Sequence, residues 1–168
     1  MKKILFFLAF LFAWLITSAQ VVDDSILIEG HYRSFHFKKP TATLANPSLV
    51  FIMHGSGGKG MGIRNSALKL EAKADAENLI VVYPDGYKNY WNECRKAATS
   101  IANLENINEA AFFTGMIGYF KVKYNINTEE VFAAGMSGGG HMAYKLAITM
   151  PDKFRAIAAV VANLPDSN

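Results

Sequence analysis

Ser137 occupies the centre of the pentapeptide Gly-Met-Ser-Gly-Gly at residues 135–139. A serine framed in this way is typical of a nucleophile on a sharp, strained strand-to-helix turn, whose neighbours must be small enough to avoid the adjoining strand and helix. The three consecutive glycines at 138–140 fit such a turn, because each would otherwise cost roughly 1 kcal/mol relative to alanine inside a helix. The turn also leaves the Gly138 amide free at a helix N-terminus, where it can stabilise a developing oxyanion. We therefore predict that Ser137 is a catalytic nucleophile and that Gly138 is one oxyanion-hole donor.

A second glycine-rich corner, His-Gly-Ser-Gly-Gly at residues 54–58, directly follows an apolar run at 49–53. In a parallel sheet, a loop at the carboxyl end of a strand lies where ligands bind. We expect the Ser56 amide, with Gly55 beside it, to supply the second oxyanion donor. A flexible turn is one alternative. A phosphate-binding loop is disfavoured, because Lys59 is followed by glycine and not by serine or threonine.

The glycines after Ser137 also allow a dinucleotide-binding interpretation, with G-x-G-x-x-A at residues 138–143 and Asp166 as the acid that binds a ribose. This pattern begins three residues beyond the end of the predicted strand. Asp166 follows Gly138 by 28 residues, instead of about 20. We therefore predict no nucleotide cofactor. We also predict no metal site, because Cys94 has no second cysteine or nearby pair of histidines.

Strand and helix patterns alternate along the chain. The predicted strands lie at 25–29, 32–38, 49–53, 79–83, 131–134 and 156–161, and the predicted helices lie at 65–77, 108–124 and 139–149. The runs at 49–53 and 79–83 are continuously apolar, as expected for strands that are covered on both faces. This order predicts an α/β fold with a mostly parallel sheet flanked by helices on both faces.

The first 19 residues are predicted to be a cleavable signal peptide. Lys2 and Lys3 precede an apolar run of thirteen residues at 4–16, and the small residues Thr-Ser-Ala follow. A run of this length falls below the roughly 18–20 apolar residues that span a bilayer. An uncleaved anchor helix is the alternative. We thus expect a secreted or periplasmic domain at 20–168, with no stable membrane insertion after cleavage.

The charge of the chain argues against a nucleic-acid partner. There are 17 basic and 14 acidic residues, a net charge of +3, and loss of Lys2 and Lys3 with the signal peptide would reduce it to +1. No cluster of lysines and arginines then remains that could follow a phosphate backbone. Cys94 is the single cysteine, so no disulfide can form within the chain as given. The sequence leaves the oligomeric state and any partner of Cys94 open.

Six motifs occur in an order that resembles one family. They are HGSGG at 54–58, YPDG at 83–86, WN at 91–92, AFFTGMI at 111–117, GMSGGGHMAYKLA at 135–147 and PDKFRAIAAV at 151–160. Together they resemble the secreted esterase branch of the α/β-hydrolases that contains polyhydroxybutyrate depolymerase-like, feruloyl and acetylxylan esterases. The order of the six motifs is far more specific than any one of them.

The resemblance implies a carboxylic ester hydrolase that works without a cofactor and forms a covalent acyl-enzyme on Ser137. The implied substrates are small or polymeric esters, either polyhydroxyalkanoate-type polyesters or feruloyl and acetyl esters of plant polysaccharides. The resemblance also places Trp91 and Asn92 near the cleft, and we expect Trp91 and His54 to bind the substrate. The pair Asn108-Glu109 departs from the family, where many relatives have a run of aspartates.

No histidine occupies the position expected for the base that takes the Ser137 proton. The fold family orders its triad as serine, then aspartate or glutamate, then histidine. His141 alone among the histidines follows Ser137, and it lies one turn along the helix that the nucleophile turns away from, so we expect it to be structural. The sequence therefore predicts the N-terminal part of a single α/β-hydrolase domain that lacks the triad Asp and His. The alternative is a catalytically inactive, hydrolase-derived protein that binds ester or glycan ligands without turnover.

Overall fold

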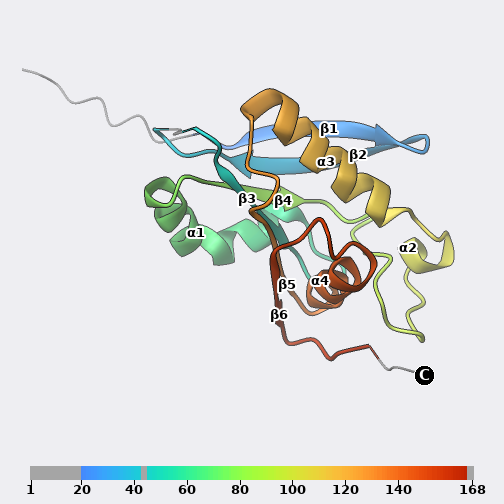
Figure 1. The fold of residues 1–168 in the computed structure, drawn as a ribbon. Coiled ribbons are helices and arrows are strands. Elements are labelled where there is room, and N and C mark those ends of the chain that lie inside the picture. Colours follow the sequence, from blue (N-terminus) through green and yellow to red (C-terminus); the bar gives the residue numbers. More distant parts are fainter. Residues whose placement is uncertain (1–19, 43–44, 166–168) are drawn as a thin grey trace, which may run out of the picture.

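A six-stranded sheet with the strand order β1-β2-β4-β3-β5-β6 forms the centre of the molecule (Figure 1). The computed structural model describes residues 20–42 and 45–165, so the predicted signal peptide lies outside the described part. The strands are β1 (Val22–Ile28), β2 (His31–Lys38), β3 (Ser48–Met53), β4 (Leu79–Pro84), β5 (Val131–Met136) and β6 (Ala156–Val160). The helices are α1 (Gly60–Ala76), α2 (Ile101–Leu104), α3 (Glu109–Tyr124) and α4 (Gly138–Thr149).

The sheet combines an antiparallel edge with a parallel body. β1 and β2 form a hairpin and β2 pairs antiparallel with β4, whereas β4, β3, β5 and β6 run parallel. In the parallel part, Met53 at the end of β3 lies opposite Gly135 of β5. The loops that follow these two strands therefore emerge side by side at the carboxyl edge of the sheet, where ligands bind in open α/β sheets.

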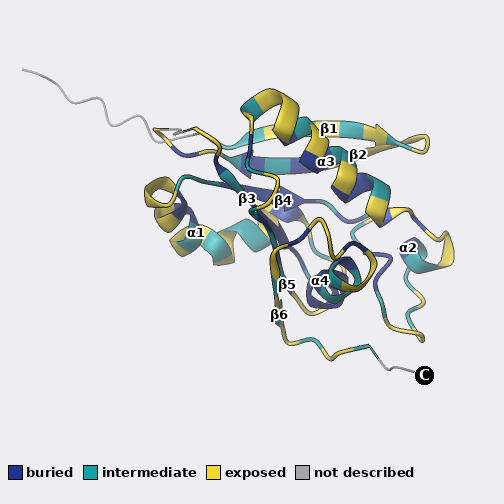
Figure 2. Cartoon of the chain, viewed as in Figure 1, coloured by how far each residue is buried: buried dark blue, intermediate teal, exposed yellow. Residues whose placement is uncertain are grey.

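Alternating residues of the central strands divide the core into two layers. Leu49, Phe51 and Met53 of β3 belong to the cluster that contains residues of α3 and α4, whereas Val50 and Ile52 pack in a second cluster with residues of α1. Both faces of the sheet are thus covered, and the buried strands lie between helices whose outer faces are exposed (Figure 2). The prediction of a mostly parallel sheet with helices on both faces is confirmed.

Two helical segments differ from the sequence-based expectation. α1 begins at Gly60 and not at residue 65, because the carboxylate of Asp85 accepts a hydrogen bond from the Gly60 amide at 2.7 Å and so satisfies a donor at the start of the helix. The short α2 was not predicted; Ser100 caps it by accepting a hydrogen bond from the Asn103 amide at 3.3 Å. None of the helices in the described residues has the length and apolar character to cross a membrane.

Candidate active site

Ser137 lies at the sharp junction between β5 and α4, as predicted. Its backbone has φ 53° and ψ −118°, a combination that residues with a side chain rarely adopt. The Ser137 amide donates to the carbonyl of Val160 at 2.9 Å, and its carbonyl accepts from the amide of His141 at 3.0 Å. The neighbouring strand and the first turn of the helix therefore hold the strained residue on both sides.

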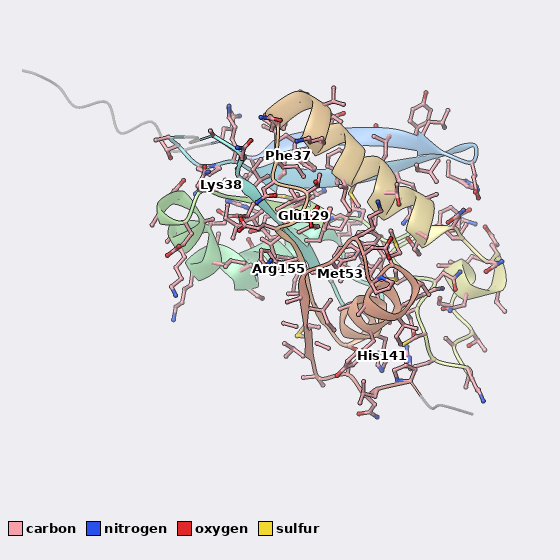
Figure 3. All side chains as sticks on the ribbon, viewed as in Figure 1. Phe37, Lys38, Met53, Glu129, His141 and Arg155 are labelled. Carbon is pink, nitrogen blue, oxygen red and sulfur yellow. The ribbon has the colours of Figure 1, made fainter. Side chains whose placement is uncertain are left out.

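Close packing of backbones explains why glycines surround Ser137. A Cβ atom on Gly135 would lie 2.2 Å from the carbonyl oxygen of Gly139, and one on Gly139 would lie 2.4 Å from the carbonyl oxygen of Met53. Real Cβ atoms essentially never come this close to a backbone oxygen, so both positions require glycine. The turn is thus pressed against the end of β3, where Met53 lies (Figure 3).

The two predicted oxyanion corners come together at this turn. A Cβ on Gly138 would lie 2.5 Å from the hydroxyl and 3.0 Å from the amide nitrogen of Ser56, and one on Gly55 would lie 3.5 Å from the Cβ of Ser137. Gly138 is the first residue of α4, so its amide has no acceptor within the helix. Among the described residues, the Ser56 amide has no acceptor either, whereas Gly57 donates to the carbonyl of Asn89. Two amides without partners therefore lie beside Ser137.

His54 fixes the conformation of the loop that carries Ser56. Its side chain is buried, its Nδ1 lies 2.7 Å from the carbonyl of Gly55, and its Nε2 lies 2.9 Å from the amide of Gly86. Because a carbonyl only accepts and an amide only donates, the ring is a neutral imidazole with its proton on Nδ1. Burial lowers the pKa of His54, which favours this neutral form. Both ring nitrogens are occupied by the protein itself, so the geometry gives His54 a positioning role.

Trp91 supports the same loop from the other side. Its indole NH donates to the carbonyl of His54 at 2.9 Å, and the two rings lie 4.9 Å apart. Only 2% of Trp91 is exposed, although it lines the larger neighbouring cavity. The substrate-binding roles expected for Trp91 and His54 stay predictions, and the contacts in the structure are those of residues that position the oxyanion loop.

The neighbouring Asn92 is tied to a buried ion pair that could not be anticipated from the sequence. Its amide donates to Glu109 at 3.1 Å, and Glu109 accepts from the guanidinium of Arg33 at 2.9 Å. The side chain of Asn92 also donates to the carbonyl of Ile107. At the pair Asn108-Glu109, where the sequence departs from many relatives, Glu109 thus connects α3, β2 and the segment after Trp91. Asn108 caps α3 by accepting a hydrogen bond from the amide of Ala111.

None of the four histidines, all of which lie in the described residues, is hydrogen-bonded to the Ser137 hydroxyl. His141 Nδ1 lies 2.9 Å from the backbone carbonyl of Ser137, His36 lies between two aspartates, and His31 packs against the ring of Tyr87. Within the described part of the chain, the Ser137 hydroxyl makes no side-chain hydrogen bond. The described residues therefore place Ser137 beside two amides without partners, and no imidazole is bonded to its hydroxyl.

Two cavities flank the Ser56 loop. The larger, of about 490 Å³, is lined by Ser56, Tyr90, Trp91, Glu93, Arg95 and residues 97–101. The smaller, of about 270 Å³, lies against His54, Gly55, Ser56, Lys59 and Met136, among others. Tyr90, Glu93 and Arg95 could not be identified from the sequence, because nothing in their local pattern indicates that the segment after β4 folds back over the loop that carries Ser56.

Comparison with known proteins agrees with this architecture. Residues 33–163 match the sequence profile of the family described as Esterase PHB depolymerase. Feruloyl esterase B of Neurospora crassa is 30% identical over 123 residues, which cover 71% of this chain and 40% of that protein. The acetylxylan esterase of Coprinopsis cinerea is 27% identical over 121 residues, 70% of this chain and 32% of that protein.

The fold also resembles that of solved esterase structures. LpqC, a poly(3-hydroxybutyrate) depolymerase from Bordetella parapertussis, superposes with a TM-score of 0.66 at 18% identity, over 84% of this chain and 52% of that one. The chain thus spans about half or less of the length of these relatives. Residues 33–163 make up most of the chain and match this one family profile, so the chain belongs to the esterase PHB depolymerase family, and its fold is of the α/β-hydrolase type.

Proposed function

We propose that the chain carries the nucleophile and the oxyanion hole of a serine carboxylic ester hydrolase. The observation that carries this proposal is the strained backbone of Ser137, with φ 53°, next to the partnerless amides of Gly138 and Ser56. A backbone this unusual persists only where the surrounding structure enforces it, as at active sites. Two amides without partners beside one serine are suited to stabilising the negative charge that develops on an ester carbonyl oxygen.

The proposed reaction has two steps. The Ser137 hydroxyl attacks the ester carbonyl carbon while a base takes its proton, and the carbonyl oxygen becomes an oxyanion held by the Ser56 and Gly138 amides. The bond to the alcohol oxygen then breaks, and the alcohol leaves with the proton, so that an acyl-enzyme remains. Water cleaves the acyl-enzyme in the second step and gives the free carboxylic acid and Ser137. The two cavities beside Ser56 are suited to the acyl and alcohol parts of the substrate.

We propose that the base and its acidic partner come from outside the described residues. Support comes from the four histidines, none of which bonds to the Ser137 hydroxyl within the described part. An unactivated serine is a poor nucleophile at neutral pH. The same observation favours a second candidate function, a family member that binds ester or glycan ligands without turnover.

Hydrolysis of p-nitrophenyl acetate by the protein expressed from its complete reading frame separates the two functions. The esterase proposal expects turnover that falls to background in Ser137→Ala, with an unchanged circular dichroism spectrum. Turnover that survives in Ser137→Ala would refute the nucleophile. Binding of the ester without turnover, equal in the original protein and in Ser137→Ala, would favour the binding function.

The substrate and location are part of the proposal. The relatives are a feruloyl esterase, an acetylxylan esterase and a poly(3-hydroxybutyrate) depolymerase, and we propose that esters of these classes are the substrates. The basic and apolar N-terminal residues support export with cleavage before Gln20. Mass spectrometry of the exported protein should find a chain that begins at or near Gln20; an intact Met1 in the membrane fraction would favour the anchor instead.

A further inference from the structure

A third cavity, of about 300 Å³, lies between α4, residues 95–97 and residues 163–165. Its polar lining comes from Arg95, Lys96, His141 and Asn163, and among the described residues that line it none is acidic. Arg95 also lines the larger cavity beside Ser56. The two cavities therefore share the side chain of Arg95, although the proposed chemistry uses only the cavity beside Ser56.

His141 offers an acceptor to this cavity. It lies on α4 (Figure 3), and only 8% of the residue is exposed. Its Nδ1 must carry the proton, because that nitrogen lies 2.9 Å from the carbonyl oxygen of Ser137, which can only accept. In the neutral imidazole this leaves Nε2 as the acceptor, and no residue in the described part donates to it. His141 lines the cavity, so this nitrogen can accept a hydrogen bond from a ligand hydroxyl there.

Arg95 offers two parallel donors to the same cavity. Its Nε donates to the carboxylate of Glu93 at 2.5 Å, and its backbone amide donates to the other oxygen at 2.7 Å. Glu93 is buried, with a side-chain exposure of 3%, so it anchors the guanidinium. The terminal nitrogens of Arg95 have no partner among the described residues, and a pair of such N–H groups matches the two oxygens of a carboxylate. Glu93 balances the charge of Arg95, and Lys96 supplies the remaining positive charge.

We propose that this cavity is a subsite for a hydroxylated carboxylate. The carboxylate binds the terminal nitrogens of Arg95 with support from Lys96, and a neighbouring hydroxyl donates to Nε2 of His141. Two sources carry this chemistry: a uronic acid residue of a polysaccharide, and the free hydroxyacid end of a polyester. The role of this subsite in substrate choice rests on the proposed esterase function, because Arg95 also lines the cavity beside Ser56.

The test measures binding by isothermal titration calorimetry, which does not depend on hydrolysis. The probes are methyl glucuronoside against methyl glucoside, and 3-hydroxybutyrate against butyrate and 3-hydroxybutyramide. We expect at least one hydroxylated carboxylate to bind with a dissociation constant about tenfold or more below that of its uncharged analogue. A tenfold difference in affinity is what one charge-assisted hydrogen bond of modest strength contributes. Preference for the uronate or for the hydroxyacid identifies the source.

Three variants assign the contacts. Arg95→Lys keeps the positive charge but removes the two parallel N–H donors of the guanidinium, so affinity for the carboxylate should fall about tenfold. His141→Asn keeps a donor near the Ser137 carbonyl and removes Nε2, so the preference for 3-hydroxybutyrate over butyrate should disappear. Lys69→Gln removes a positive charge from the exposed surface of α1 and should change nothing.

The outcomes separate this proposal from the proposed function. Equal binding of charged and neutral probes, the absence of binding, or an Arg95→Lys variant indistinguishable from Lys69→Gln would overturn the subsite. Ser137→Ala should retain binding of the carboxylate probes. If hydrolysis instead survives in Ser137→Ala while carboxylate binding is intact and depends on Arg95, the esterase assignment to Ser137 fails and the subsite stands.

Discussion

The strain at Ser137 leads to a prediction of inverted stability between two substitutions. The backbone at φ 53° and ψ −118° should cost about 1–3 kcal/mol for a residue with a Cβ atom. Ser137→Ala retains the Cβ and therefore the strain, whereas Ser137→Gly removes both. Glycine also adds unfolded-state freedom worth roughly 0.5–1 kcal/mol. The Gly variant should therefore be more stable than the Ala variant by roughly 1 kcal/mol, and by about 2.5 kcal/mol at most.

Urea denaturation measures this difference through the fluorescence of Trp91. This residue is buried and is the only tryptophan after residue 19, so its emission reports unfolding of the layer beside the oxyanion loop. Ala72→Gly at an exposed position of α1 is the control and should lose roughly 1 kcal/mol, the ordinary cost of glycine in a helix. A Ser137→Gly variant that is no more stable than Ser137→Ala would refute the claim that the turn stores strain.

Three further changes test the surroundings of the site. Gly138→Ala should push the loop that carries Ser56 away and lower the rate of p-nitrophenyl acetate hydrolysis roughly a hundredfold. Gly62→Ala is the control and should leave the rate unchanged, because nothing lies within 4 Å of the added Cβ. Equal rates in the two variants would contradict the steric argument. Glu109→Gln leaves Arg33 buried without its carboxylate and should cost about 3 kcal/mol in urea denaturation, so a loss below about 1 kcal/mol would show that the pair is unimportant. Burial lowers the pKa of His54 in the folded protein, so the unfolded chain binds the proton at a higher pH than the folded chain does. The free energy of unfolding should therefore fall as the pH drops below about 6.5, and it should level off beneath the folded-state pKa. His54→Gln should flatten this pH dependence, and an identical slope in the variant would assign the dependence to other groups.

Local patterns in the sequence were sufficient for the parts of the fold with a strong period or strong turn chemistry. The runs that became β3 and β4 were continuous and apolar, and their burial on both faces follows from that pattern. The glycines around Ser137 indicated a crowded strand-to-helix turn, and the Gly139 contact with Met53 is the reason they are there. The family and the fold could thus be predicted, and the nearness of Ser56 to Gly138 followed from the parallel order of β3 and β5.

Long-range contacts determined what could not be predicted. α1 starts at Gly60 because Asp85, far along the chain, accepts a bond from its amide. The roles of His54 and Trp91 depend on partners in other segments, and a buried histidine with both nitrogens occupied has the same local sequence as one that faces a substrate. Arg95 could not be recognised either, because its place between two cavities depends on how the segment after β4 folds over the sheet.

Covalent labelling tests the central claim most directly. The protein expressed from its complete reading frame would be treated with a fluorophosphonate, digested, and analysed by mass spectrometry of its peptides. We expect a stoichiometric adduct on Ser137 that is absent from Ser137→Ala, with Ser56 unlabelled. An adduct on another serine, or hydrolytic activity without any adduct on Ser137, would contradict it.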